Sequence, residues 1–124
     1  MNTDDVAAGV RSALAGAGEM REIKMFGGLG FLLNGNMIAA VSRRGLLLRV
    51  GKDGESEAFA RPGSRPMEMR GRTMEGYVYV DPSVLTESAI KAWLQLAEDF
   101  VQTLPPKAPG SRPARTKGKR TSRA

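Results

Sequence analysis

The residues that could carry out chemistry in this chain are few, because its composition removes the commonest ones. The sequence contains no histidine and no cysteine among its 124 residues. It therefore lacks the usual general base near neutral pH, the usual metal ligand and any thiolate nucleophile. Serines such as Ser42 and Ser83 have no histidine to activate them, and Lys24 stands in no serine–lysine motif. The sequence predicts a protein without catalytic residues, bound metal or cofactor.

A glycine-rich stretch, residues 24–35, is the remaining chemical candidate. It holds four of the chain's 15 glycines. A glycine loop that cradles phosphate leads into a helix N-terminus, whereas an alternating strand pattern follows here. Glycines at this density suit a bend, a bulge or a close backbone approach. We expect a structural motif rather than a nucleotide site, made of Met25, Phe26, Gly27, Gly28, Gly30, Asn34 and Gly35.

The expected conformation of this stretch is a bent strand followed by a hairpin. Asn34-Gly35 predicts a type I′ turn, because both central residues of that turn need positive φ. An alternative function starts from the same bend. A polar pocket beside Gly27–Gly30, with Arg49 or Glu22 converging on it, would indicate a small-ligand-binding protein or an enzyme. A filled, apolar contact at the bend would remove that alternative.

Hydrophobic periodicity predicts the elements that must position these residues. One helical stripe covers residues 3–17, with Thr3 as the expected N-cap, and another follows the expected N-cap Thr86. A weakly helical segment covers 53–60. Strand patterns occupy residues 21–26, 29–33, 37–41, 46–50, 65–70 and 74–80. Short connections favour antiparallel pairing. We expect a two-layer α+β domain, an antiparallel sheet of five to six strands with the N- and C-terminal helices packed on it.

Two groups of side chains on the last two predicted strands have competing interpretations. Tyr77 and Tyr79 alternate on one face, and aromatic rings beside arginines can stack single-stranded bases. Tyrosines half-buried beneath a helix are commoner and are our expectation. Met67, Met69 and Met74 are likewise expected as core filler rather than as a groove for a partner. The nearby arginines are Arg65, Arg70 and Arg72.

The last part of the chain differs in charge from the rest. Residues 105–124 contain seven basic residues and no acidic one, whereas residues 1–104 contain 12 basic and 13 acidic residues. We expect a folded domain over 1–106 and a disordered basic tail over 107–124. The tail either contacts nucleic acid without reading sequence or serves as a solubilising terminus. Its basic residues are Lys107, Arg112, Arg115, Lys117, Lys119, Arg120 and Arg123.

The sequence carries no sign of membrane insertion or secretion. Its first residues are polar and acidic, and no apolar run approaches the ~20 residues that a helix needs to span a bilayer. We expect a cytoplasmic protein that makes no membrane contact. The expected partners are another protein, nucleic acid bound by the tail, and a second copy of the chain bound through a sheet edge or an open sheet face.

Three segments resemble the N-terminal domain family of TfoX/Sxy proteins. They are Lys24–Phe31, Asn34–Met37 and Leu46–Val50, and the resemblance runs from about residue 10 to residue 107. Later segments, Arg61–Gly63 and Gly76–Val80, are similar to the family's actinobacterial members. The resemblance implies a two-layer α/β domain with an antiparallel sheet, and it brings no catalytic residues.

The same resemblance implies a regulatory role. Named members of the family regulate natural competence, act with the cyclic-AMP receptor protein and carry a second, C-terminal domain. This chain instead continues into the short basic tail. The resemblance therefore implies a stand-alone, non-enzymatic regulatory or adaptor domain, related to transcription or competence.

Overall fold

The computed structural model describes residues 2–25 and 27–106. Its strands form a sheet in which every neighbouring pair is antiparallel, in the order β1-β2-β3-β4-β6-β5. The strands are β1 (Met20–Met25), β2 (Gly28–Leu33), β3 (Asn36–Ser42), β4 (Gly45–Arg49), β5 (Ser64–Met69) and β6 (Arg72–Val80). The helices are α1 (Thr3–Leu14), α2 (Gly51–Ala60) and α3 (Glu87–Val101), with a short 3-10 helix at Pro82–Val84.

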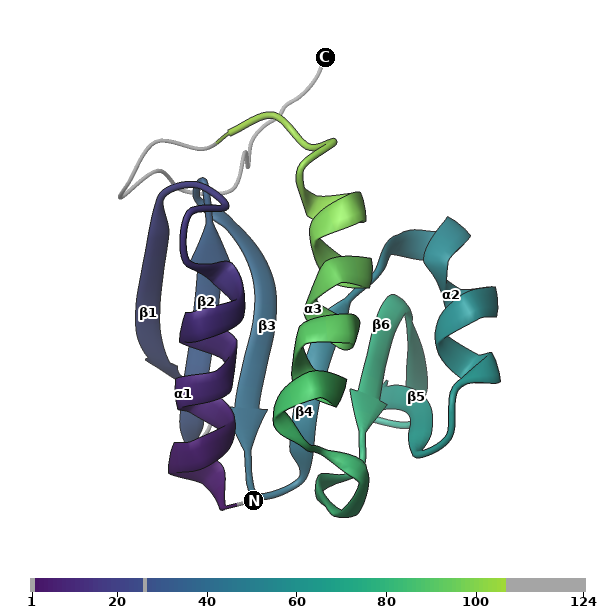
Figure 1. Ribbon diagram of the computed structural model, residues 1–124. Coiled ribbons are helices and arrows are strands. Elements are labelled where there is room, and N and C mark those ends of the chain that lie inside the picture. The colour runs from purple at the N-terminus through teal and green to yellow at the C-terminus, as the bar shows by residue number, and fades with distance from the viewer. Residues whose placement is uncertain (1, 26, 107–124) are drawn as a thin grey trace.

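The predicted α+β fold is confirmed, with six strands in the described sheet. The first four strands follow one another as a meander, and β6 then joins β4, so that β5 forms the far edge. Figure 1 shows α1 and α3 lying across the same side of the sheet, with α2 beyond β6. The N- and C-terminal helices thus pack on the sheet, as the sequence predicted.

The glycine-rich stretch forms a hairpin, so the prediction of a bent strand was wrong. Met25 on β1 pairs with Gly28 on β2 in an antiparallel register, which places the chain reversal between them. Gly27 lies at this reversal with a φ of +77°, a conformation that glycine adopts without steric cost. Phe26 lies outside the described residues.

The predicted turn between β2 and β3 is confirmed. Asn34 and Gly35 have φ values of +53° and +83°, as a type I′ turn requires at both central positions. The side-chain oxygen of Asn34 also accepts the backbone N–H of Glu19 at 3.0 Å. This contact ties the turn to the start of the β1 edge.

The helix caps agree with the prediction at one helix and differ at the other. Thr86 caps α3, because its hydroxyl accepts the backbone N–H of Ala89 at 3.1 Å. At α1 the cap is Asn2 rather than Thr3, and its side-chain oxygen accepts a backbone N–H of the first turn at 2.8 Å. The prediction of Thr3 was therefore wrong by one residue, because a carboxamide and a hydroxyl are both good N-caps.

The hydrophobic core lies between the sheet and the helices. Inward side chains of the central strands, such as Phe31, Leu48 and Val78, are fully buried. They pack in one cluster with the apolar stripe of α3, which includes Ile90 and Leu94. Each such side chain contributes roughly 1.5–3 kcal/mol by leaving water. The core therefore fixes which face of each strand is turned away from the helices.

One buried polar side chain holds the segment that follows α3. Asn36, at the start of β3, is only 2% exposed. Its Nδ2 donates a hydrogen bond of 2.9 Å to the carbonyl of Pro105, which gives a buried amide the partner that it needs.

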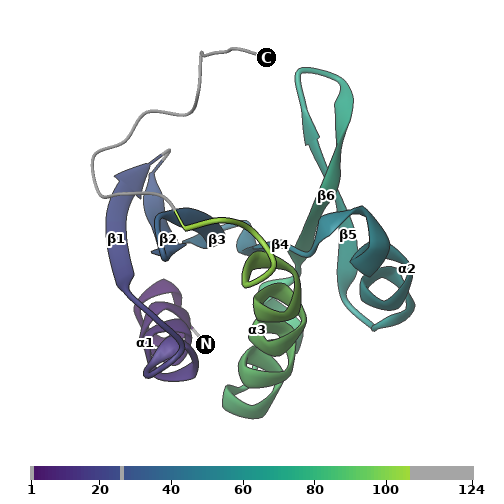
Figure 2. The ribbon, with the colours of Figure 1, turned by 90° about the horizontal axis from the view of Figure 1, so that it is seen from above.

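The far side of the sheet carries none of the described helices. In the view from above, α1 and α3 lie on one side, while the far end of the β5–β6 hairpin rises on the other (Figure 2). Among the described residues there is no helix whose length and apolar character would let it cross a bilayer.

Candidate partner-binding face

The sheet face opposite the helices is apolar and hollowed. Side chains alternate along a strand, so Leu47 points to this face between the core residues Leu46 and Leu48. A groove of about 900 Å³ lies here. We call this surface the open face and define it by nine residues that line the groove: Met25, Met37, Ala40, Leu47, Met67, Met69, Met74, Tyr77 and Tyr79.

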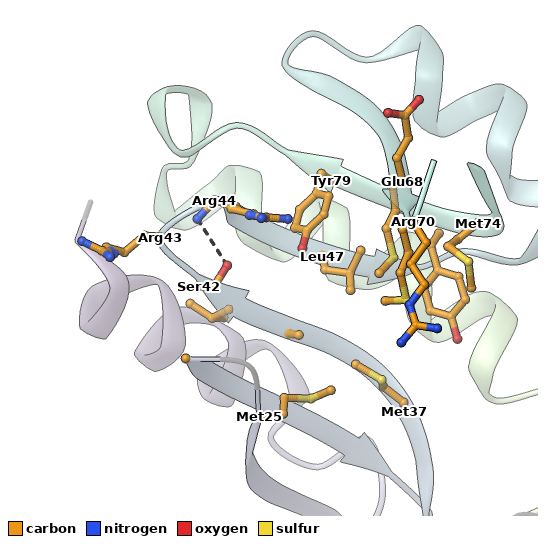
Figure 3. Close-up of a pocket in the computed structure, with 16 residues that line it drawn as sticks. Met25, Met37, Ser42, Arg43, Arg44, Leu47, Glu68, Arg70, Met74 and Tyr79 are labelled. Carbon is orange, nitrogen blue, oxygen red and sulfur yellow. Dashed lines mark hydrogen bonds between the residues drawn. The ribbon is translucent and has the colours of Figure 1, made fainter. Parts of the chain in front are cut away.

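Five of the chain's seven methionines belong to the open face. Met69 is 43% exposed, and the other four are half-buried. The prediction that Met67, Met69 and Met74 are core filler was therefore wrong, because they lie on the opposite side of the sheet from the core. Unbranched, polarisable methionine side chains adapt their shape to what they contact. Figure 3 shows Met25 and Met37 on one side of the groove and Met74 on the other.

Two glycines of the structural motif shape this face by close approach. A side chain at position 30 would overlap the sulfur of Met25 and come within 3.3 Å of Ile23 Cγ1. Both neighbours can therefore lie flat over Gly30. A side chain at position 28 would instead overlap the backbone carbonyl oxygen of Val41 on β3. Close backbone approach, one of the expected causes of the glycine density, is confirmed at Gly28.

The tyrosines of β6 belong to the open face and not to a helix-covered surface. Tyr77 and Tyr79 are half-buried, as expected, but they point away from the helices. The guanidinium carbon of Arg65 lies 5.2 Å from the centre of the Tyr79 ring. Arg65 also donates to the Arg44 carbonyl at 3.0 Å and lies 3.7 Å from the Asp81 carboxylate. Arg65 is thus held against Tyr79 by contacts on two sides.

The charge around the groove is mainly positive. Its charged lining residues are Arg43 and Arg44 in the β3–β4 turn, Arg70 in the β5–β6 turn, and Glu68 on β5. Figure 3 shows Arg70 reaching toward the methionines and Arg44 pointing toward Tyr79, whereas Arg43 and Glu68 point away from the groove. The apolar floor is therefore bordered by two inward arginines.

The two side chains expected at a polar pocket beside the bend are engaged elsewhere. The guanidinium carbon of Arg49 lies 5.6 Å from the centre of the Phe100 ring. Glu22 pairs with Arg11 of α1 through two hydrogen bonds of 2.5 and 2.9 Å. This hydrogen-bonded guanidinium lowers the pKa of the Glu22 carboxyl. The groove does reach Met25 and Gly27, but neither Arg49 nor Glu22 lines it.

Two further expectations concerned bound metal and the basic tail. In the part of the chain that the structure describes, no three potential acidic, histidine or cysteine ligands come together as a metal site. The tail residues predicted to contact nucleic acid lie outside the described residues: Lys107, Arg112, Arg115, Lys117, Lys119, Arg120 and Arg123.

Comparison with known proteins adds one match. A family model described as the TfoX N-terminal domain matches residues 12–101. This range contains every described strand, and with them the whole open face. Neither the curated proteins nor the solved structures gave a match.

Proposed function

Since the chain belongs to the TfoX N-terminal domain family, we propose that it is a non-enzymatic regulatory adaptor that binds a protein partner on its open face. The family suggests a regulatory, competence-related role and is not known as enzymatic. The observation that carries the proposal is the gathering of five methionines, two tyrosines and Leu47 on a sheet face that no described helix covers. Contiguous apolar patches of this kind mark interaction sites.

The sheet edges offer less to a partner than the face does. On the β1 edge, Arg21, Glu22 and Lys24 place charged side chains along the strand, and all three are exposed. On the β5 edge, Pro66 has no N–H to donate to an added strand. Charges and proline on edge strands oppose strand addition. The proposal therefore places the contact on the open face, by side-chain packing.

The basic tail has a separate role in this proposal, which is to contact nucleic acid. Seven basic residues and no acidic one follow a body whose charges nearly cancel. Such a segment attracts phosphates without reading base sequence. We propose that the tail adds non-specific nucleic-acid contact in the cytoplasm while the open face binds the protein partner.

A capture experiment with matched variants tests the role of the open face. The tagged full chain, Met69→Glu and Phe59→Glu are used as baits at native salt, before and after nuclease treatment. Met69 on the open face and Phe59 on α2 are almost equally exposed, at 43% and 42%, so the two substitutions should perturb folding to a similar extent.

The expected result is a set of proteins retained by the wild type and by Phe59→Glu after nuclease treatment, and lost with Met69→Glu. Far-UV circular dichroism confirms that all three baits are folded. Retention of the same proteins by Met69→Glu, or loss of all of them on nuclease treatment, would contradict the proposal.

A further inference from the structure

We infer that the segment bound by the open face is an amphipathic helix whose apolar anchors are flanked by acidic residues. This inference rests on the proposed function, and it adds the chemistry and the secondary structure of the partner. It follows from the sizes of the side chains across the open face, from the charges and the proline on the edge strands, and from the charges around the groove.

The relief of the open face comes from one row of side chains across the sheet. Strand register places Gly30, Ala40, Leu47 and Tyr79 side by side in that order, with Ile23 and Arg65 at the two ends. Gly30 and Ala40, the two smallest residues, are second and third of the six, and the sulfur of Met25 lies over Gly30. Ala40 is the low point of the row, with Met25 on one side of it and Leu47 and Tyr79 on the other. The row therefore forms a trough, and the β5–β6 hairpin rises beside it (Figure 2).

A helix suits this trough better than a strand does. Adding a strand needs an open edge with free N–H groups, and Pro66 and the charged β1 edge oppose that. The same sheet already packs α1 and α3 on its inner face. Apolar side chains of an amphipathic helix could contact the methionines from above, as they do in other helix-in-groove complexes.

The charges favour a helix with acidic flanks. Arg70 and Arg44 border the apolar floor, while Glu68 points away (Figure 3). The nearby Asp81 carboxylate faces Arg65 at 3.7 Å. Carboxylates on a bound helix would therefore meet positive charge without an opposing acid. Ion pairs at such a rim add little affinity, but they decide between partners.

Two other occupants fit less well. Stacking of nucleic-acid bases needs free aromatic faces, and Arg65 already lies against Tyr79, one of the two tyrosines of the open face. A second copy packed by two-fold symmetry would bring the same positive rim against itself. Both remain as outcomes that the experiment separates.

The methionines themselves are the reporters for the test. The full chain is labelled at its methionine methyl carbons, and each methyl signal is followed by NMR. The first probe is a synthetic amphipathic helical peptide with Leu and Phe on one face and Glu beside them. The second is its twin with Lys in place of every Glu, and the third is oligothymidylate. Met20, which packs against the core, is the internal reference.

The acidic peptide should shift the signals of Met25, Met37 and Met74 and leave that of Met20 in place. Its affinity should exceed that of the Lys twin by about tenfold, the effect of about 1.4 kcal/mol. Arg70→Glu should abolish this preference, because only Arg44 then remains as an inward positive charge on the rim. Arg72→Glu is the matched control, because Arg72 is exposed beside the same turn but does not line the groove.

Equal affinity for the two peptides, or no binding of either, overturns the inference. Shifts at the open face caused by oligothymidylate alone assign the face to nucleic acid. Shifts that grow with protein concentration, without a probe, assign it to a second copy. If the peptides fail while Met69→Glu still loses the captured proteins, only the acidic helix is wrong and the proposed function stands.

Discussion

The thioether of Met25 lies over the bare Cα of Gly30, in the place that a side chain at position 30 would occupy. Met25 pairs with Gly28 in the β1–β2 ladder, so this contact runs diagonally across the two strands on the open face. The two glycines of β2 therefore have different structural roles. Gly28 admits the backbone of β3, and Gly30 admits a flexible side chain.

The first prediction compares the cost of adding a methyl group at each of these two glycines. Gly28→Ala should cost about 2 kcal/mol or more, because the new methyl group meets a backbone carbonyl oxygen that cannot move alone. Gly30→Ala should cost less than about 1 kcal/mol, because the end of Met25 can turn aside. Urea unfolding measures both, and the methyl NMR signal of Met25 should move further in Gly30→Ala, where the new methyl group meets its sulfur. Equal costs would show that Met25 cannot relax.

The second prediction concerns the ion pair between α1 and β1. The hydrogen-bonded Arg11 guanidinium lowers the pKa of Glu22, so the pair stabilises the fold above the unfolded pKa of about 4.3. That contribution is lost as the pH falls through the lower, folded pKa. Glu22→Gln should be less stable than the wild type at pH 7, and the difference should close in acid and shrink in high salt. Urea midpoints across pH measure it, and a gap that persists at low pH would exclude the charge as its cause.

The third prediction concerns Glu98 on α3, whose charge should destabilise the fold, whereas that of Glu22 stabilises it. Burial, and secondarily the charge of Asp99, raise the pKa of Glu98 on α3, so the ionised form disfavours the folded state at neutral pH. Glu98→Gln should raise the free energy of unfolding at pH 7 by about 0.5 kcal/mol or less. The gain should vanish below about pH 4, where the carboxyl is protonated in both states.

A control for Glu98 is available on the same helix. Glu87 lies in the first turn of α3, where the helix dipole stabilises a negatively charged carboxylate. Glu87→Gln should therefore not stabilise the protein at pH 7. Thermal unfolding followed across pH distinguishes the two variants.

The fourth prediction concerns Arg61, which joins α2 to α3. Its guanidinium carbon lies 4.7 Å from the centre of the Trp93 ring, and it donates to Glu57 at 2.7 Å and to the Ala92 carbonyl at 3.2 Å. Arg61→Ala should cost about 1–2 kcal/mol. Arg61→Lys should recover less than half of that, because an ammonium does not stack as a planar guanidinium does. Urea unfolding followed by circular dichroism measures the cost, and full recovery by lysine would exclude stacking.

The fifth prediction concerns the tail. The full chain should bind duplex DNA with an affinity that falls steeply with salt, because each neutralised phosphate releases counterions. A chain ending at residue 106 should lose most of this affinity and its salt dependence. A scrambled tail of the same composition should retain both. Fluorescence anisotropy at several salt concentrations measures them, and an unchanged salt slope after truncation would assign the binding to the body.

Local features of the fold followed well from the sequence. The Asn34-Gly35 turn and the Thr86 cap depend on residues that are close in the chain, and both lie where expected. The hairpin between β1 and β2 was missed because a glycine run suits a bend, a bulge or a reversal equally. Only the pairing of Met25 with Gly28, a matter of register, decides between them.

The candidate site was harder to predict because both faces of the central strands are apolar. The run Leu46-Leu47-Leu48 places apolar residues on both sides of β4, so alternation cannot say which side the helices cover. That choice depends on how the connections place α1 and α3 on one side of the sheet. Alternation places Met67 and Met69 on one face of β5, but it does not show that this face points away from the helices, so these residues were expected in the core.

The hydrogen bond from Asn36 to Pro105 has a consequence for where the chain can be cut. A truncation ending at residue 104 removes the carbonyl that accepts from Nδ2 and leaves an amide that is 2% exposed without its acceptor. An orphaned buried donor costs about 1–3 kcal/mol, which a chain ending at 106 avoids. Pro105 thus belongs to the folded domain, because its carbonyl is the acceptor for the buried Asn36 amide.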